Sequence, residues 1–271
     1  MNRVLTLNDL NLITNFYRKL NKLSEDLMKN IIMNIGTNII IVAHVKNNEI
    51  TSMITANLIK NNYYLEKFLY LHYNSEEIIS LLDFLIQSLD HQKGNIILCD
   101  NYPYDESTNV MLLSSGFKYN YIDYISEPSE NKIESINFKF AINDKSDDVI
   151  KYLLKNVLIV AEKTNQYLNI ASNEVNPIIN VDNTNLAVIR DNNNAVVGVS
   201  SFTIVGDNMF VHSIYGENDD VLDKLIRLIK SITTRPIEIG VMPVRNELIS
   251  FLDQKGFIRN QADYFRNVSE I

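Results

Sequence analysis

The sequence contains little cysteine, proline or glycine, and no tryptophan. Its 271 residues include one cysteine, five prolines and eight glycines. The single Cys99 excludes an internal disulfide, which is typical of proteins from reducing compartments, and we therefore expect a cytoplasmic location. Because the glycines occur singly, the sequence has no glycine-rich loop of the Walker or dinucleotide type to cradle a phosphate.

Positive charge and long apolar runs are scarce as well. The 25 lysines and arginines are outnumbered by 33 aspartates and glutamates, and the net charge of -8 provides no basic field for a nucleic acid. The longest apolar stretch, residues 39–45, is much shorter than the ~20 residues of a membrane helix. The four histidines are isolated, and no Cys/His spacing fits a zinc site. We expect no nucleic acid, membrane or metal as a partner.

What the sequence does contain is a repeat. The pattern Gly-Phe-x-x-Asn-x-x-Asp-Tyr occurs at residues 116–124 and returns 140 residues later at residues 256–264. At the same offset, Tyr-Leu-His at 70–72 corresponds to Phe-Val-His at 210–212. Several matches at one offset indicate that a domain-sized unit has been duplicated.

Each half also repeats one series of predicted elements. Alternating and helical spacings predict a strand, a helical segment, a three-strand meander, a helix, a buried strand, a helix and a last strand. The polar segment 127–136 contains a proline and no periodicity, so it is the predicted linker between domains 1–126 and 137–271. The predicted fold class is α/β (α+β), with two tandem domains that each have a mixed, mainly antiparallel sheet flanked by helices.

Three predicted boundaries are specific enough to compare with a structure. The third strand of the first half is predicted to be continuous over residues 63–73. The pair Asn8-Asp9 is predicted to start the first helix, and Asn143-Asp144 to start its counterpart.

The order of elements resembles the GNAT acyltransferases, the acetyl-CoA-dependent N-acetyltransferase superfamily, present twice. Gly-Phe follows the fourth helix of each half, and residues 69–73 and 209–213 are similar to the family's Leu-x-Val-His-Pro turn. The resemblance covers nearly the whole chain outside the linker. It implies acetyl-CoA as the acyl donor and an amine of a small molecule or peptide as the acceptor. A homodimer is compatible with the sequence.

In that family the fourth strand and the start of the following helix hold the pyrophosphate of coenzyme A, with the help of an Arg/Gln-x-x-Gly-x-Gly/Ala turn. Carried over to the second half, the resemblance implies that the cofactor-binding residues are Val211, Ser213, Tyr215, Gly216, Asp220 and Val221. Both halves depart from the family turn. Residues 72–77 contain no glycine, lysine or arginine before the helix, and residues 216–220 contain carboxylates that would repel a pyrophosphate.

Acetylation of an amine needs a base to take the ammonium proton and an acid to protonate the leaving thiolate. The tyrosine that often supplies the acid in this family is replaced by Leu112 and Leu252. His212 and His72 are candidate bases at equivalent positions, because a neutral imidazole suits this role near pH 7. The remaining catalytic candidates are Asp207, Glu66 and Tyr102. For each of these residues the alternative is a structural or solvated side chain.

Three functions follow from these observations. The first is an acyltransferase in which the C-terminal half is the better candidate for activity, because Tyr215-Gly216 keeps the loop length and one glycine. The alternative is a non-catalytic protein that uses a GNAT-like scaffold to bind a ligand or another protein. A third, an aminoacyl-tRNA-dependent transferase, would need a basic surface that the net charge of -8 does not provide.

Overall fold

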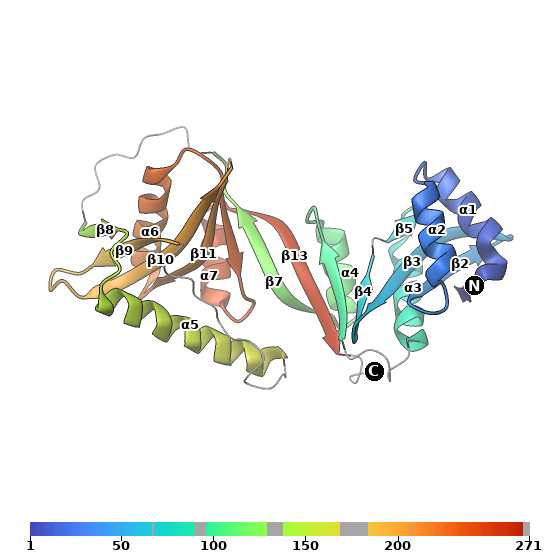
Figure 1. Cartoon of the computed structure of the whole chain (residues 1–271), viewed down its shortest axis with the longest axis horizontal. Coiled ribbons are helices and arrows are strands. Elements are labelled where there is room, and N and C mark those ends of the chain that lie inside the picture. Colours follow the sequence, from blue (N-terminus) through green and yellow to red (C-terminus); the bar gives the residue numbers. More distant parts are fainter. Residues whose placement is uncertain (67, 90–95, 129–137, 169–183, 207, 268–271) are drawn as a thin grey trace. The chain divides into compact units, whose positions relative to one another are not determined.

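A computed structural model describes residues 1–66, 68–89, 96–128, 138–168, 184–206 and 208–267 (Figure 1). The chain forms two compact units. Unit 1 consists of residues 1–119 and 263–271, and unit 2 consists of residues 120–262. None of the described helices is both long enough and apolar enough to cross a membrane.

Unit 1 begins with the N-terminal half of the chain. Its elements are β1 (Asn2–Leu5), the short 3-10 helix η1 (Leu7–Asp9), α1 (Leu10–Lys19), α2 (Glu25–Asn34), β2 (Ile39–Lys46), β3 (Glu49–Ile59), β4 (Asn62–Leu65), β5 (Leu69–Tyr70), α3 (Ser75–Ser88), β6 (Ile96–Asn101) and α4 (Glu106–Ser114). Its strands lie in the order β1-β2-β3-β4-β6. The pair β4–β6 is parallel and the other pairs are antiparallel.

Helices cover both faces of this sheet because β2 is apolar on both sides. Ile41 and Ala43 pack in one cluster with Phe16 of α1 and Ile31 of α2. The alternate residue Val42 points to the opposite face, where α3 contacts β1, β2 and β3. Each face of the sheet is therefore a separate core layer.

Unit 2 repeats this order with one long helix after its first strand. Its elements are β8 (Phe140–Ile142), α5 (Asp147–Leu168), β9 (Asn185–Arg190), β10 (Val196–Val205), β11 (Asn208–Gly216), α6 (Asp219–Ile232), β12 (Ile237–Val241) and α7 (Asn246–Gln254). The strands lie in the order β12-β11-β10-β9-β8, and only β11–β12 is parallel.

Helices α5 and α6 lie on opposite faces of this sheet. Val199 packs with Val149 of α5, whereas its neighbour Gly198 faces α6. A Cβ atom at Gly198 would lie 2.5 Å from Val221 Cγ1 and 3.1 Å from Leu225 Cδ1. Glycine therefore permits the first turns of α6 to pack directly on β10.

Gly198→Ala is expected to lower the free energy of unfolding by about 1–3 kcal/mol, because the added methyl group overpacks this contact. Chemical denaturation of the variant and of the wild type measures the difference. The same substitution in a Val221→Ala background should cost less, since the shorter side chain leaves room for the methyl group. Equal costs in the two backgrounds would contradict the close packing of α6 on Gly198.

Each half of the sequence supplies its last strand to the unit of the other half. β7 (Lys118–Ile125) pairs antiparallel with β12, and residues 120–125 belong to unit 2. β13 (Ile258–Asn267) is the neighbour of β6, and its residues from 263 onward belong to unit 1. The compact units therefore differ from the predicted domains 1–126 and 137–271, which remain a prediction about the duplicated sequence. Of the predicted linker 127–136, residues 129–136 lie outside the described residues.

The repeated tyrosines anchor these exchanged strands. In unit 1, the buried Tyr264 donates a hydrogen bond to Asn109 Oδ1 (2.8 Å), and its ring centre lies 5.0 Å from that of Tyr119. In unit 2, Tyr124 donates to Asp253 Oδ1 (3.0 Å) and accepts from Arg259 Nε (3.1 Å). The tyrosine that ends each copy of the repeated pattern is thus buried against residues from the other half of the sequence.

The structure confirms the predicted fold class and order of elements, and it corrects two of the three specific boundaries. The predicted strand 63–73 is divided into β4 and β5. The pair Asn8-Asp9 directly precedes α1, with Asp9 at its N-cap position, and the short helix η1, capped by Thr6, comes before it. Helix α5 starts at Asp147 because Asn143 adopts a positive φ of 59° and Asp144 binds Ser146.

Candidate functional site

The parallel strands of unit 2 part after a short shared ladder. Residues 209–211 of β11 pair with residues 237–239 of β12. Beyond these pairs β11 remains beside β10 as far as Gly216, whereas β12 continues beside β7. In the described part of the chain, no strand lies along this edge of β11 after Val211. We call this place the β11–β12 fork.

Two predicted residues lie where the fork begins. His212 is the extra residue of a β-bulge, because Ser201 faces Ser213 and the next residue of β10 faces Val211. The His212 side chain is exposed, and its Nε2 lies 2.9 Å from Thr203 Oγ1. Ser213 bonds through its hydroxyl to Ser201 Oγ (2.6 Å). The bulge thus places a histidine at the point where the strands part.

An arginine that sequence reasoning missed lies at the edge of β11. Arg245 Nη1 donates to the Ile214 carbonyl oxygen (2.7 Å), and its guanidinium carbon lies 4.7 Å from the centre of the Tyr215 ring. Burial raises the pKa of Tyr215, and the positive charge of Arg245 partly offsets that effect. Because Ile214 lies beyond the last β11–β12 pair, this guanidinium enters the fork.

The predicted binding residues at the start of α6 take part in the packing and surface contacts of this helix. The side chain of Asn218 caps the helix by accepting from the Val221 amide (3.1 Å). Asp220 pairs with Lys224 (2.6 Å) on the exposed surface. A Cβ at Gly216 would meet the Leu222 amide nitrogen at 3.1 Å, so this glycine makes room for the helix. The helix start is therefore a poor fit for a pyrophosphate.

A tyrosine from the other half of the sequence reaches the fork. Gly240 is the first residue of β12 beyond the ladder shared with β11. A Cβ at Gly240 would lie 1.4 Å from the Tyr121 hydroxyl oxygen, so the phenol lies directly over the glycine backbone. Tyr121 comes from the exchanged strand β7. The positions 140 residues away are Asp100 and Gln261, so the unit 1 counterpart of this place lacks both the glycine and the tyrosine.

Unit 1 has its own carboxylate at the corresponding helix start. Glu77, in the first turn of α3, accepts hydrogen bonds through Oε1 from Ser52 (2.6 Å) and Thr51 (2.8 Å). Its Oε2 lies 3.7 Å from His44 Nε2. Burial favours a higher pKa for Glu77, but the two hydroxyl donors and His44 outweigh it, and the pKa is lowered. An ionised side chain thus lies beside the place where the family resemblance implies a phosphate.

The other predicted residues that the structure describes do not form a common site. His72 is exposed after β5, and Tyr102 is 54% exposed after β6. Glu66 accepts from Asn57 Nδ2 (2.7 Å) on the surface of unit 1. Asp207 lies outside the described residues. Cys99 is buried, which raises the pKa of its thiol to about 12, so it is a core residue with no nucleophilic character.

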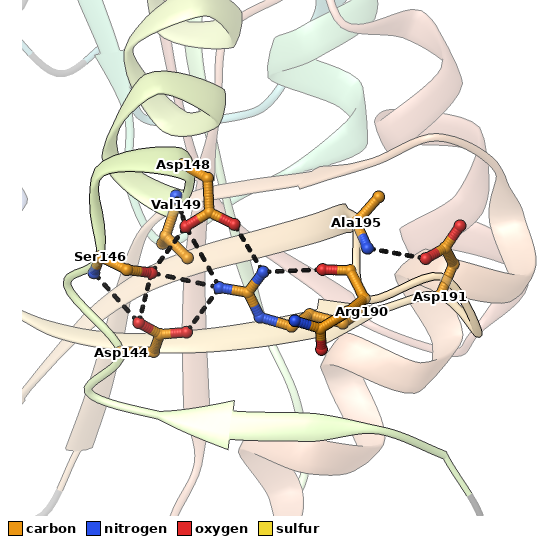
Figure 2. Close-up of polar contacts among 8 residues, drawn as sticks. Asp144, Ser146, Asp148, Val149, Arg190, Asp191 and Ala195 are labelled. Atoms are coloured by element: carbon orange, nitrogen blue, oxygen red, sulfur yellow. Dashed lines mark hydrogen bonds and ion pairs between the residues drawn. The ribbon is translucent and has the colours of Figure 1, made fainter.

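A second arginine of unit 2 forms the cluster in Figure 2. Arg190 of β9 bonds to Asp148 Oδ2 (2.6 Å) and Asp144 Oδ2 (2.8 Å), and Ser146 links the two carboxylates. The bonds from Arg190 and Ser146 lower the pKa of Asp148. Since the guanidinium is matched by two carboxylates, we assign this cluster to the attachment of the α5 start to β9.

Comparisons with known proteins give structural likeness only. No family model and no curated protein match the sequence. A GCN5-related N-acetyltransferase from Sphaerobacter thermophilus is 10% identical, with a TM-score of 0.43 over 99% of this chain and 95% of that one. A tandem GNAT protein from the clavulanic acid biosynthesis pathway is 9% identical, with a TM-score of 0.38 over 99% of both chains. A probable acetyltransferase from Staphylococcus epidermidis is 18% identical, with a TM-score of 0.39 over 47% of this chain and 90% of its own.

Because the sequence identities and TM-scores are low, the fold is described from the order of elements and the strand pairing within each unit.

Proposed function

We propose that unit 2 binds an acyl-coenzyme A at the β11–β12 fork and transfers its acyl group to an amine. The observation that carries this proposal is the separation of two parallel strands after residues 211 and 239. Beyond that point the backbone edge of β11 has no neighbouring strand in the described residues, so its amide and carbonyl groups can pair with the amide-containing arm of coenzyme A.

Two side chains at the fork support the chemistry. His212, at the bulge of β11, is the proposed base that removes the proton of the attacking ammonium. When its Nε2 donates to Thr203 Oγ1, the other ring nitrogen, Nδ1, accepts this proton. Tyr121, over Gly240, is the proposed acid. A bound thioester supplies an activated acyl group whose sulfur leaves as a thiolate, and the Tyr121 hydroxyl would give that sulfur its proton.

A non-catalytic role is the second candidate, and Glu77 favours it for unit 1. Four contacts involve this helix start: the cap from Asn74, the two hydroxyl bonds and the approach of His44. A phosphate would have to displace a carboxylate that already interacts with these groups. We therefore propose unit 1 as the structural partner and unit 2 as the working half.

Calorimetric titration of the full chain with acetyl-CoA tests the proposal. Asp219→Asn combined with Asp220→Asn is expected to tighten binding at least about tenfold, because one carboxylate ~4 Å from a phosphate costs on the order of 4 kcal/mol at a surface dielectric of ~20. Glu76→Gln, an exposed residue in the first turn of α3, is the matched control in unit 1 and should leave the affinity unchanged. The absence of heat at about 1 mM ligand, in the wild type and in the double variant, would contradict acyl transfer and favour the second candidate.

A further inference from the structure

Arg245 is a nearly buried cation at the edge of the fork. It directly precedes α7, and its side chain reaches β11, where Nη1 bonds to the Ile214 carbonyl oxygen (2.7 Å). The guanidinium stacks on the Tyr215 ring, and the side chain is only 11% exposed. A positive charge is therefore held beside the backbone edge that the proposed function assigns to ligand binding.

The positive charge of Arg245 is less well neutralised by carboxylates than that of Arg190. The two side chains are similarly buried, at 11% and 13% exposure. Arg190 bonds to two carboxylates, whereas Arg245 bonds to a neutral carbonyl and, through Nε alone, to Glu247 at 3.2 Å. Glu247 is 65% exposed, and an exposed partner contributes little. The other N–H donors of Arg245 have no hydrogen-bond partner among the described residues, and none of its nitrogens is a fully buried unpaired atom, so these donors remain open to a ligand.

The side chain at position 245 also fails to cap the helix that follows it. Its counterpart in unit 1, 140 residues earlier, is Asp105, which caps α4 by accepting from the Thr108 amide (2.7 Å). Arg245 occupies the same position before α7 and makes no side-chain cap bond. An aspartate or asparagine there would satisfy the helix start better, so the arginine serves something other than the helix.

We propose that Arg245 binds an oxyanion of the ligand, a carboxylate or a phosphate, which replaces the Ile214 carbonyl as its main partner. This inference rests on the proposed function, because it takes the fork to be the binding site. A guanidinium offers two parallel donors to such a group, and a charge-assisted bidentate pair is stronger and more specific than a bond to one carbonyl. Release of Ile214 would also free its carbonyl to pair with the bound ligand.

Calorimetry on the full chain with malonyl-CoA and acetyl-CoA tests the proposal, since these probes differ by one carboxylate. We expect malonyl-CoA to bind wild type at least about tenfold more tightly than acetyl-CoA, and Arg245→Gln to remove the difference. If the anion is a phosphate of coenzyme A, Arg245→Gln should instead weaken both probes and coenzyme A equally, by about tenfold. Unchanged affinities in Arg245→Gln overturn the proposal, and Arg227→Gln, an exposed arginine on α6, is the matched control.

Small anions separate this proposal from the proposed function. If no coenzyme A compound binds wild type, the proposed function fails. Even in that case, calorimetry that detects binding of malonate or inorganic phosphate to wild type, but not to Arg245→Gln, would support the anion site. If neither anion nor any coenzyme A compound binds, both proposals are overturned.

Arg245→Asp distinguishes a ligand-binding arginine from a structural one. This variant recreates the cap found at Asp105 but removes the bonds to Ile214 and Glu247, so we expect the midpoint of thermal unfolding to change little while the preference for malonyl-CoA is lost. An Arg245→Asp variant that folds and keeps the wild-type preference and affinities would overturn the proposal.

Discussion

Tyr264→Ala is expected to destabilise unit 1 by roughly 4 kcal/mol, although the residue lies close to the C-terminal end of the sequence. The side chain is fully buried, its ring packs beside Tyr119, and its hydroxyl bonds to Asn109. Removing it leaves a cavity in the unit formed mainly by the other half of the chain. Hydrogen exchange of amides in β6 and β10 would measure the two units separately.

Matched variants make this expectation specific. Tyr264→Phe should cost only about 1 kcal/mol, because it removes one hydrogen bond and Tyr119 still donates to Asn109. Tyr124→Ala should instead destabilise unit 2, where the hydroxyl of Tyr124 bonds to Asp253 and Arg259. Faster exchange in β10 than in β6 for Tyr264→Ala would show that the strand exchange does not hold unit 1 together.

Tyr121→Phe is expected to lower kcat about 10²-fold with little change in KM, because the phenol is the proposed proton donor to the leaving thiolate. The loss should shrink with acyl donors whose thiol is more acidic, since such a thiolate leaves without needing a proton. Initial rates with a series of acyl thioesters would give this dependence.

Gly240→Ala provides an independent test of the same phenol. A Cβ at this position would lie 1.4 Å from the Tyr121 hydroxyl oxygen, so the ring must move and turnover should fall as in Tyr121→Phe. Tyr124→Phe, on the same exchanged strand, is the control and should keep normal turnover. If Tyr121→Phe is as active as wild type toward every thioester, the role of Tyr121 as an acid is wrong.

Local sequence patterns predicted the order of helices and strands, but not which strands pair with one another. The sequence Asn-Ser-Glu-Glu at residues 74–77 is typical of a helix start, and Asn74 does cap α3. The last strands 118–125 and 258–267 carry the same repeated letters, so no local signal states which unit each strand joins. That choice depends on pairing over more than a hundred residues, which sequence periodicity does not encode.

The candidate site shows the same division between local and distant signals. His212 was a candidate because it and His72 occupy equivalent positions in the two copies. Gly216 was interpreted as part of a phosphate turn, because a glycine indicates close approach without stating whether a helix or a ligand approaches. Arg245 contacts Ile214 of β11, and Tyr121 lies over Gly240 of β12, so both meet residues far from them in the sequence. The sequence feature that could have identified them is the difference between the two copies at the 140-residue offset, because the counterpart of Arg245 is Asp105 and that of Tyr121 is Gln261.

The exchange of β7 and β13 has a consequence for how the two copies can change over time. Deletion of either copy would leave the other without the strand that completes its unit, so the duplication cannot be reversed by losing one half. The residues around the fork are under no such constraint, and they differ between the halves. Interlocking of this kind lets the residues around the fork diverge in one copy while that copy is still needed to complete the other unit.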